Sequence, residues 1–166
     1  MLIAPRMNDS ERLEYRPCVG VMLVNRQGKA FVGKRIDNRE GDWWQMPQGG
    51  VDDGEAVEAA LVREIGEEVG ARPEHLDVVA RLPDELFYDL PPELNGKLWG
   101  GRFKGQRQTW FLVRFTGTDD DVDLEAHDPP EFCEWKWVDP GDLPGLIVPF
   151  KRGVYQAIVE GFRAKL

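Results

Sequence analysis

Residues 49–71 read GGVDDGEAVEAALVREIGEEVGA and are the most informative part of the chain. They predict a glycine-rich loop and then a helix that begins near Asp53 as N-cap and runs to Val69, with Gly70 as the stop. Apolar residues recur at every fourth position of this helix, which indicates one buried face. They are Val57, Leu61, Ile65 and Val69.

Three glutamates lie on another arc of the same helix. Glu64 precedes Glu67 by three residues and Glu68 by four, so all three fall within about 100° of the helix surface. Each pair of like charges at this spacing costs a few tenths of a kcal/mol. Hard divalent cations such as Mg²⁺ favour carboxylate oxygens and would reverse that penalty, which suggests a metal site. A solvated acidic face is the usual explanation for a glutamate-rich helix taken alone.

The spacing of the fixed residues resembles the Nudix box: Gly49, five residues, Glu55, seven residues, then REIGEEVG from Arg63. The resemblance implies an α/β fold, an α/β/α sandwich with a mixed sheet. It also implies hydrolysis of a nucleoside diphosphate linkage with Mg²⁺ or Mn²⁺. By position, Glu64, Glu67 and Glu68 would bind metal together with the Gly49 carbonyl, and one of these glutamates would help to deprotonate water; which one is left open. Glu55 and Arg63 would form a structural ion pair between loop and helix.

The resemblance extends over residues 15–162, to one Nudix subgroup: bacterial RNA pyrophosphohydrolases and the similar plant-type diadenosine tetraphosphate hydrolases. The segments that carry it are YRP at 15–17, WQMPQGG at 44–50, YDLPPE at 88–93, GQRQTWF at 105–111, PEFCEWKW at 130–137 and PFKRGVY at 149–155. By position, the subgroup implies that Glu131 reaches the metals and that Tyr88 and Phe150 stack a purine. Phe150 could equally be the first core residue of the last helix.

Positive and polar residues supply the remaining substrate-binding candidates. We expect Arg35, Lys104 and Lys151 to bind phosphate, because arginine offers a fork for phosphate oxygens and lysine a point charge. Arg16 and Arg107 are further candidates. Gln48 could bind phosphate or a metal-bound water, or could close a turn. Trp43, Trp44 and Trp99 lie near predicted loops and could border the substrate.

Composition limits the partners of the chain. Its 166 residues suit one domain, with residues 1–14 as a polar tail and residues 15–166 as a single hydrolase domain. The net charge of −9 excludes a broad cationic surface for non-specific nucleic-acid binding, so DNA is not expected as a partner. No signal peptide or membrane-spanning run is evident, so we expect a cytoplasmic protein without a membrane partner. The oligomeric state stays open, and a monomer is plausible.

The remaining pattern predicts strands and one more helix. A hairpin is expected from Cys18–Val24 and Ala30–Lys34, because turn residues separate two apolar runs. Further strands are expected at Leu76–Arg81, Glu85–Tyr88, Thr109–Phe115 and Phe132–Val138, and a last helix at Phe150–Lys165. Leu90–Gln108 is expected to be a long loop, and loops of that length are often functional.

The resemblance implies a Nudix pyrophosphohydrolase acting on nucleotide 5′-polyphosphates. It would remove pyrophosphate from triphosphorylated RNA 5′ ends, cleave dinucleoside polyphosphates such as diadenosine tetraphosphate asymmetrically to ATP and AMP, or do both. One alternative is a house-cleaning or sugar-nucleotide pyrophosphatase with a different pocket. A non-catalytic Nudix-fold sensor is disfavoured, because all the box glutamates are present.

Overall fold

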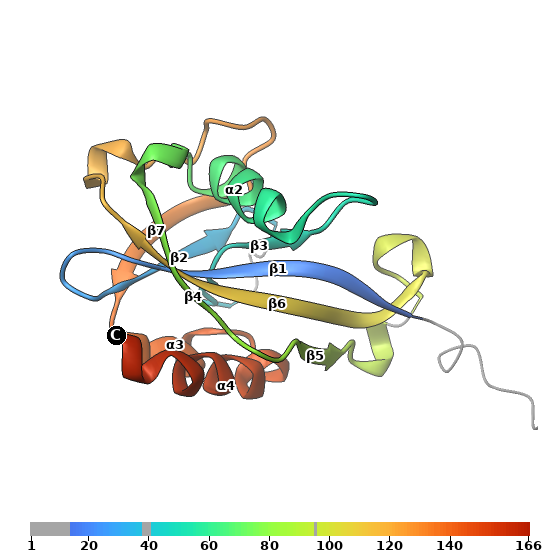
Figure 1. The fold of residues 1–166 in the computed structure, drawn as a ribbon. Coiled ribbons are helices and arrows are strands. Elements are labelled where there is room, and N and C mark those ends of the chain that lie inside the picture. The colour runs from blue at the N-terminus through green and yellow to red at the C-terminus, as the bar shows by residue number, and fades with distance from the viewer. Residues whose placement is uncertain (1–13, 38–40, 95) are drawn as a thin grey trace, which may run out of the picture.

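A seven-stranded mixed sheet forms the centre of the molecule in the computed structural model, which describes residues 14–37, 41–94 and 96–166 (Figure 1). The strand order is β4-β6-β1-β2-β7, with β3 paired to β1 and β5 paired to β6. Strands β1 and β6 run parallel, and every other pair is antiparallel. The strands are β1 Glu14–Val24, β2 Ala30–Arg35, β3 Gln48–Gly50, β4 Leu76–Arg81, β5 Leu86–Asp89, β6 Phe103–Phe115 and β7 Phe132–Val138.

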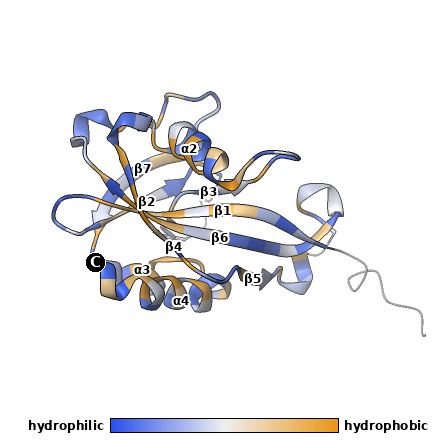
Figure 2. Cartoon of the chain, viewed as in Figure 1, coloured by the Kyte–Doolittle hydropathy of each residue, from blue (hydrophilic) through white to orange (hydrophobic). Residues whose placement is uncertain are grey.

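Helices cover both faces of the sheet, which confirms the predicted α/β/α arrangement. Helix α2 (Val57–Glu68) packs on one face, and α3 (Leu143–Leu146) and α4 (Arg152–Phe162) pack on the other (Figure 1). Alternate residues of β1 serve the two cores, because successive strand side chains point to opposite faces. Val21 and Leu23 join the α2 core, and Met22 joins the α4 core. Figure 2 shows hydrophobic residues along β1, whereas β6 is hydrophilic near β5.

The predicted apolar stripe of α2 is confirmed, but the predicted start of the helix is wrong. Leu61, Ile65 and Val69 are fully or almost fully buried, and Val57 packs against the same core. The helix begins at Val57, four residues after Asp53. Residues 52–55 form a turn instead, closed by a 2.9 Å bond from the backbone N–H of residue 55 to the carbonyl of residue 52.

The predicted long loop is shorter than expected, because β6 begins at Phe103. Residues 103–108 pair with the first half of β1, where Tyr15 is opposite Gly105 and Cys18 is opposite Gln108. The predicted hairpin of β1 and β2 is confirmed, with Val24 opposite Ala30. Strand β3 and helix α3 were not predicted.

The predicted tail of residues 1–14 lies outside the described residues except for its last member, which begins β1. In the described part of the chain, no helix has both the length and the apolar character needed to span a membrane.

Candidate functional site: an acidic helix facing a cationic and aromatic wall

The glycine-rich loop reaches the helix by way of β3. Gln48, Gly49 and Gly50 pair with residues 18–20 of β1, so the loop is fixed at the middle of the sheet. Gly49 lies directly against the carboxylate of Glu64, and a Cβ at position 49 would overlap that carboxylate. Glycine is therefore required for this close approach.

Arg63 joins the loop to the helix. Its guanidinium donates two 2.8 Å hydrogen bonds to the carboxylate of Glu55 and one of 2.8 Å to the carbonyl of Gly50. It also donates to Glu64 at 2.8 Å and to Glu67 at 3.4 Å. The bonds from Arg63 lower the pKa of Glu55 to about 2. The predicted partners therefore lie together, and the same arginine also holds two of the box glutamates.

Glu64 and Glu68 are the buried carboxylates of the helix, 8% and 4% exposed. Burial raises the pKa of Glu68 well above its usual value, and the negative charges of Glu64 and Glu131 raise it further. A 3.1 Å hydrogen bond from the backbone N–H of Gln48 acts in the opposite direction. Burial also raises the pKa of Glu64, although its bond to Arg63 opposes the shift.

The donor atoms suit a hard divalent cation. Glu64, Glu68 and Glu131 offer carboxylate oxygens and Gly49 offers a carbonyl, which are ligands typical of Mg²⁺. Burial raises the pKa of Glu68 and the charges of Glu64 and Glu131 add to the shift, so a bound cation would favour the ionised carboxylate. Within the residues that the structure describes, no three Asp, Glu, His or Cys side chains already form a metal-binding group.

The carboxylates line one side of a broad cleft. The residues around it are Arg16, Arg35, Asp37, Trp43, Gln48, Gly49, Gly50, Glu64, Glu67, Glu68, Tyr88, Leu90, Leu94, Leu98, Trp99, Gln106, Glu131, Val148, Phe150 and Lys151. Acidic groups from α2 thus share one cavity with basic and aromatic groups from six other segments. An anionic ligand with an aromatic base would find complementary groups on both sides.

The two predicted stacking residues lie together in this cleft. The ring centroids of Tyr88 and Phe150 are 5.9 Å apart, with an angle of 52° between the planes. Tyr88 belongs to β5 and is buried, in agreement with the strand predicted at Glu85–Tyr88. Phe150 belongs to the 3₁₀ turn Pro149–Lys151 before α4 and is 40% exposed, so it is not a core residue of the last helix.

Lys151 and Arg35 bring positive charge to the same region. The Lys151 ammonium lies 5.1 Å from the centroid of the Tyr88 ring and 5.8 Å from that of Phe150. Burial, together with the charge of Arg35, lowers the pKa of Lys151 to about 8. Arg35 pairs with Asp37 at 2.7 Å, and its guanidinium is 4.0 Å from Glu131.

Two other candidate cations lie elsewhere. Lys104 does not line the cleft, and its ammonium lies 4.7 Å from the centroid of the Tyr15 ring. Arg107 pairs with Glu85 at 3.5 Å, also away from the cleft. Arg16 does line the cleft, with its guanidinium 5.4 Å from the centroid of the Trp99 ring.

The tryptophan expectation is partly wrong, because Trp44 is a buried core residue, whereas Trp43 and Trp99 line the cleft. The sequence-based interpretation missed Gln106, which also lines it. Its signal was the polar residues at alternate positions of a buried strand, 106 and 108, where apolar side chains are the norm.

Comparison with known proteins identifies the family. The sequence matches the NUDIX domain over residues 14–158. An Erythrobacter litoralis protein named RNA pyrophosphohydrolase is 59% identical over 156 residues, which cover 94% of this chain and 95% of the relative. A Novosphingobium aromaticivorans protein of the same name is 59% identical over 158 residues, covering 95% and 98%.

Solved structures share the fold at lower identity. The Caenorhabditis elegans Ap4A hydrolase binary complex has a TM-score of 0.65 and 22% identity, with 91% of this chain and 99% of that chain covered. The Escherichia coli dihydroneopterin triphosphate pyrophosphohydrolase has a TM-score of 0.67 and 20% identity, covering 88% and 97%. Since the NUDIX match spans most of the residues described above, the chain belongs to the Nudix family.

Proposed function

We propose that this protein is an RNA pyrophosphohydrolase that removes pyrophosphate from the 5′ end of triphosphorylated RNA. The observation that carries the proposal is the cleft, in which the buried carboxylates Glu64 and Glu68 face Arg35, Lys151 and the exposed ring of Phe150. The two relatives named RNA pyrophosphohydrolase support the choice of substrate. The net charge of −9 agrees with contacts restricted to the RNA end.

Nudix enzymes typically depend on a divalent metal ion. Here Glu64, Glu67, Glu68, Glu131 and the Gly49 carbonyl would hold Mg²⁺ or Mn²⁺. When bound, such an ion neutralises phosphate oxygens and acidifies water. Arg63 keeps the loop and the helix in register, since it binds both the Gly50 carbonyl and Glu64. A buried glutamate with a raised pKa, Glu68 or Glu64, is suited to accept a proton from the attacking water.

The opposite wall binds the nucleotide. Lys151 and Arg35 contact the phosphate chain, and Arg16 extends the positive surface toward β1. Phe150 and Tyr88 stack the first base, a contact worth about 1–3 kcal/mol that tolerates different bases. The tilt of 52° between the two rings means that the exposed Phe150 must turn to admit a base. A substrate of this kind is available in the bacterial cytoplasm, which we propose as the compartment.

A direct comparison of substrates tests the proposal. Purified protein with Mg²⁺ is offered 5′-triphosphate RNA and diadenosine tetraphosphate in parallel, and the products are identified. We expect pyrophosphate and 5′-monophosphate RNA, with a higher kcat/KM for RNA. A higher kcat/KM for diadenosine tetraphosphate, with ATP and AMP as products, would show that the protein is a dinucleoside polyphosphate hydrolase instead. No hydrolysis of either substrate would reject both.

A further inference from the structure

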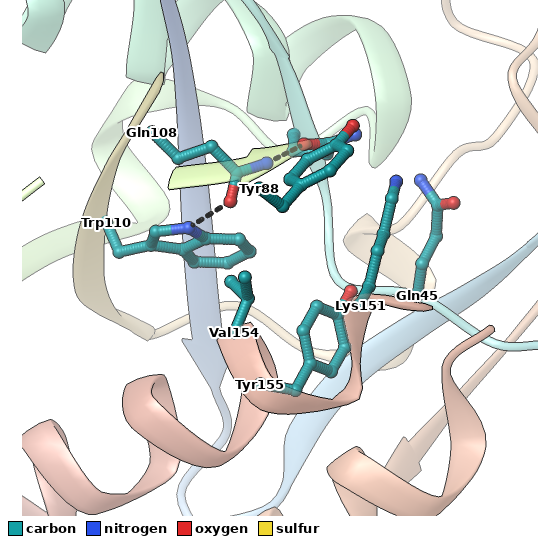
Figure 3. Close-up of a pocket in the computed structure, with 8 residues that line it drawn as sticks. Gln45, Tyr88, Gln108, Trp110, Lys151, Val154 and Tyr155 are labelled. Atoms are coloured by element: carbon teal, nitrogen blue, oxygen red, sulfur yellow. Dashed lines mark hydrogen bonds between the residues drawn. The ribbon is translucent and has the colours of Figure 1, made fainter. Parts of the chain in front are cut away.

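A tryptophan side chain and three glutamine side chains form a continuous hydrogen-bonded network beneath the cleft. The indole Nε1 of Trp110 donates to Oε1 of Gln108 at 2.8 Å (Figure 3). The amide nitrogen of Gln108 donates to Oε1 of Gln48 and to Oε1 of Gln106, both at 2.7 Å. Gln106 and Gln108 are 2% exposed, and Trp110 is 1% exposed. Water therefore cannot readily replace a lost partner.

Trp110 fixes which group donates and which accepts in each hydrogen bond of this network. An indole N–H can only donate, so the atom of Gln108 that faces it must be the carbonyl oxygen. The amide nitrogen of Gln108 then points the other way, and its two protons meet two oxygens. Gln48 and Gln106 must both present their carbonyl oxygens to it. Reversal of any one amide would bring two donors or two acceptors together in a buried place, which is strongly disfavoured.

The orientation leaves two amide nitrogens for the cleft. In residues 14–37, 41–94 and 96–166, neither nitrogen donates to another protein atom. Over the same residues, Nδ1 of His75 is the only buried side-chain nitrogen or oxygen without a partner, so both amide nitrogens reach accessible space. Gln48 and Gln106 both line the cleft that holds the box glutamates.

We propose that Trp110 is a positioning residue that fixes Gln48 and Gln106 with their N–H₂ groups toward the substrate phosphates. The inference rests on the proposed function, because it assumes an anionic polyphosphate in the cleft. Amide nitrogens donate hydrogen bonds to phosphate oxygens, whereas amide oxygens in the same place would repel them. A donor-only group inside the core thus determines whether two glutamines attract or reject the ligand.

The first test removes the donor and keeps a ring. In Trp110→Phe the amide group of Gln108 is free to rotate by 180°. Gln48 and Gln106 can then present their amide oxygens to the cleft as readily as their amide nitrogens. We expect KM for 5′-triphosphate RNA to rise about tenfold, the effect of losing a hydrogen bond to a charged group, with kcat changed much less. Gln108→Met, which removes both donors without touching Trp110, should give a similar rise. Gln108→Met provides the test if circular dichroism shows that Trp110→Phe does not fold.

A double-mutant comparison separates orientation from packing. In a background that carries Gln48→Ala and Gln106→Ala, neither cleft-lining amide remains for Gln108 to orient, so adding Trp110→Phe should leave KM unchanged. A loss that persists in this background would show that Trp110 acts through packing and would overturn the proposal. Trp137→Phe is the matched control, because its indole N–H bonds Asp119 at 2.8 Å, outside the cleft. It should have no effect on KM.

Binding of inorganic pyrophosphate with Mg²⁺, measured by calorimetry, keeps this inference separate from the proposed function. If wild type binds pyrophosphate and Trp110→Phe weakens it about tenfold, the inference stands even if RNA is not hydrolysed. If RNA is hydrolysed but neither KM nor the Kd for pyrophosphate changes in Trp110→Phe, the inference fails and the proposed function stands. Absence of pyrophosphate binding by wild type would also overturn the inference.

Discussion

Gly49 and Glu64 are in direct contact, so that a methyl group on residue 49 would overlap the carboxylate of residue 64. Gly49→Ala is therefore expected to displace that carboxylate from the cleft. We expect kcat/KM to fall by at least about 100-fold and stability to fall by about 1–3 kcal/mol, the usual cost of overpacking. Steady-state kinetics and thermal unfolding provide the two measurements.

Gly66→Ala is the matched control for that variant. Gly66 lies in the middle of α2, and a Cβ there would meet no atom within 4 Å. Alanine should stabilise the helix by about 0.5–1 kcal/mol and leave the kinetics unchanged. A loss of activity in Gly66→Ala equal to that in Gly49→Ala would show that any added methyl group is harmful, and that contact with Glu64 is not the cause.

Glu68→Gln should nearly abolish turnover while making the metal-free protein more stable. The pKa of Glu68 is raised in the folded state, so wild-type stability falls as the pH rises from the ordinary value of 4.5 toward the raised one. The amide has no such loss. At pH 7–8 in EDTA the variant should therefore unfold at a higher temperature, by about 2–4 °C for each kcal/mol.

Added Mg²⁺ should reduce the difference in unfolding temperature between wild type and Glu68→Gln. A cation that binds Glu68 stabilises wild type by mass action, and the variant lacks this charged ligand. Thermal scans with EDTA and with Mg²⁺ measure both effects. Equal stabilisation of the two proteins by Mg²⁺ would remove Glu68 from the set of metal ligands, and full activity of the variant would remove it from the site.

Arg63→Lys should lower kcat/KM by more than about tenfold, because one ammonium cannot replace a guanidinium that binds Glu55, Gly50 and Glu64 together. Arg72→Lys is the control, since the guanidinium of Arg72 forms an exposed 3.9 Å pair with Glu74 and does not line the cleft. Activity assays of the two variants decide whether the fork geometry of Arg63 matters.

The pairing of Glu55 with Arg63 also predicts that the stability of the protein depends on pH. The pKa of Glu55 is lowered to about 2, so its contribution is complete above the ordinary pKa of 4.5 and is lost as the pH falls from 4.5 toward 2. The loss should be absent in Glu55→Gln. Denaturant titrations at pH 6 and pH 3 measure it, and an identical pH response of the two proteins would contradict this assignment.

Substrate affinity should decrease above pH 8. The pKa of Lys151 is lowered to about 8, so this side chain loses its charge on passing from pH 7 to pH 9, where an ordinary lysine stays charged. KM for triphosphate RNA should rise several-fold over that range. Lys151→Met should have a high KM that does not change with pH, and a rise in the variant as steep as in wild type would point to another group.

Phe150→Ala should raise KM about tenfold with a smaller effect on kcat, because base stacking acts at a distance from the reacting phosphorus. Phe87→Ala is the control, since Phe87 is also an exposed aromatic residue but packs on Tyr15 and does not line the cleft. Tyr88→Ala should act in the same direction as Phe150→Ala. Unchanged KM in both cleft variants would rule out the stacking assignment.

The local sequence pattern was sufficient to predict the buried face of α2 but not the residue at which the helix begins. The four-residue spacing of Leu61, Ile65 and Val69 is an intrinsic property of a helix, and the structure buries all three. The start of α2 was misplaced, because Asp53 is an attractive N-cap by residue type. In the structure, residues 52–55 form a turn, Arg63 of the helix binds Glu55, and α2 begins only at Val57.

The start of β6 and the position of Lys104 could not be predicted for a related reason. Residues 104–108 are polar apart from Gly105, and they become a strand because β1 pairs with them from a distant part of the sequence. Lys104 was chosen by residue type, but Tyr15 meets it at the start of the paired strands, away from the cleft. Glu131 could be predicted as a metal ligand only from the family resemblance, since no local periodicity connects residue 131 to α2.

The parallel pairing of β1 with β6 has a consequence for biosynthesis. Along its whole length, from Glu14 to Val24, β1 is joined to a strand that ends at Phe115. A nascent chain emerging from the ribosome therefore exposes one edge of its first strand until more than half of the polypeptide has been translated. We expect cooperative folding to start only after that point, so ribosome-bound chains stopped before residue 103 should remain open to proteases and in need of chaperones.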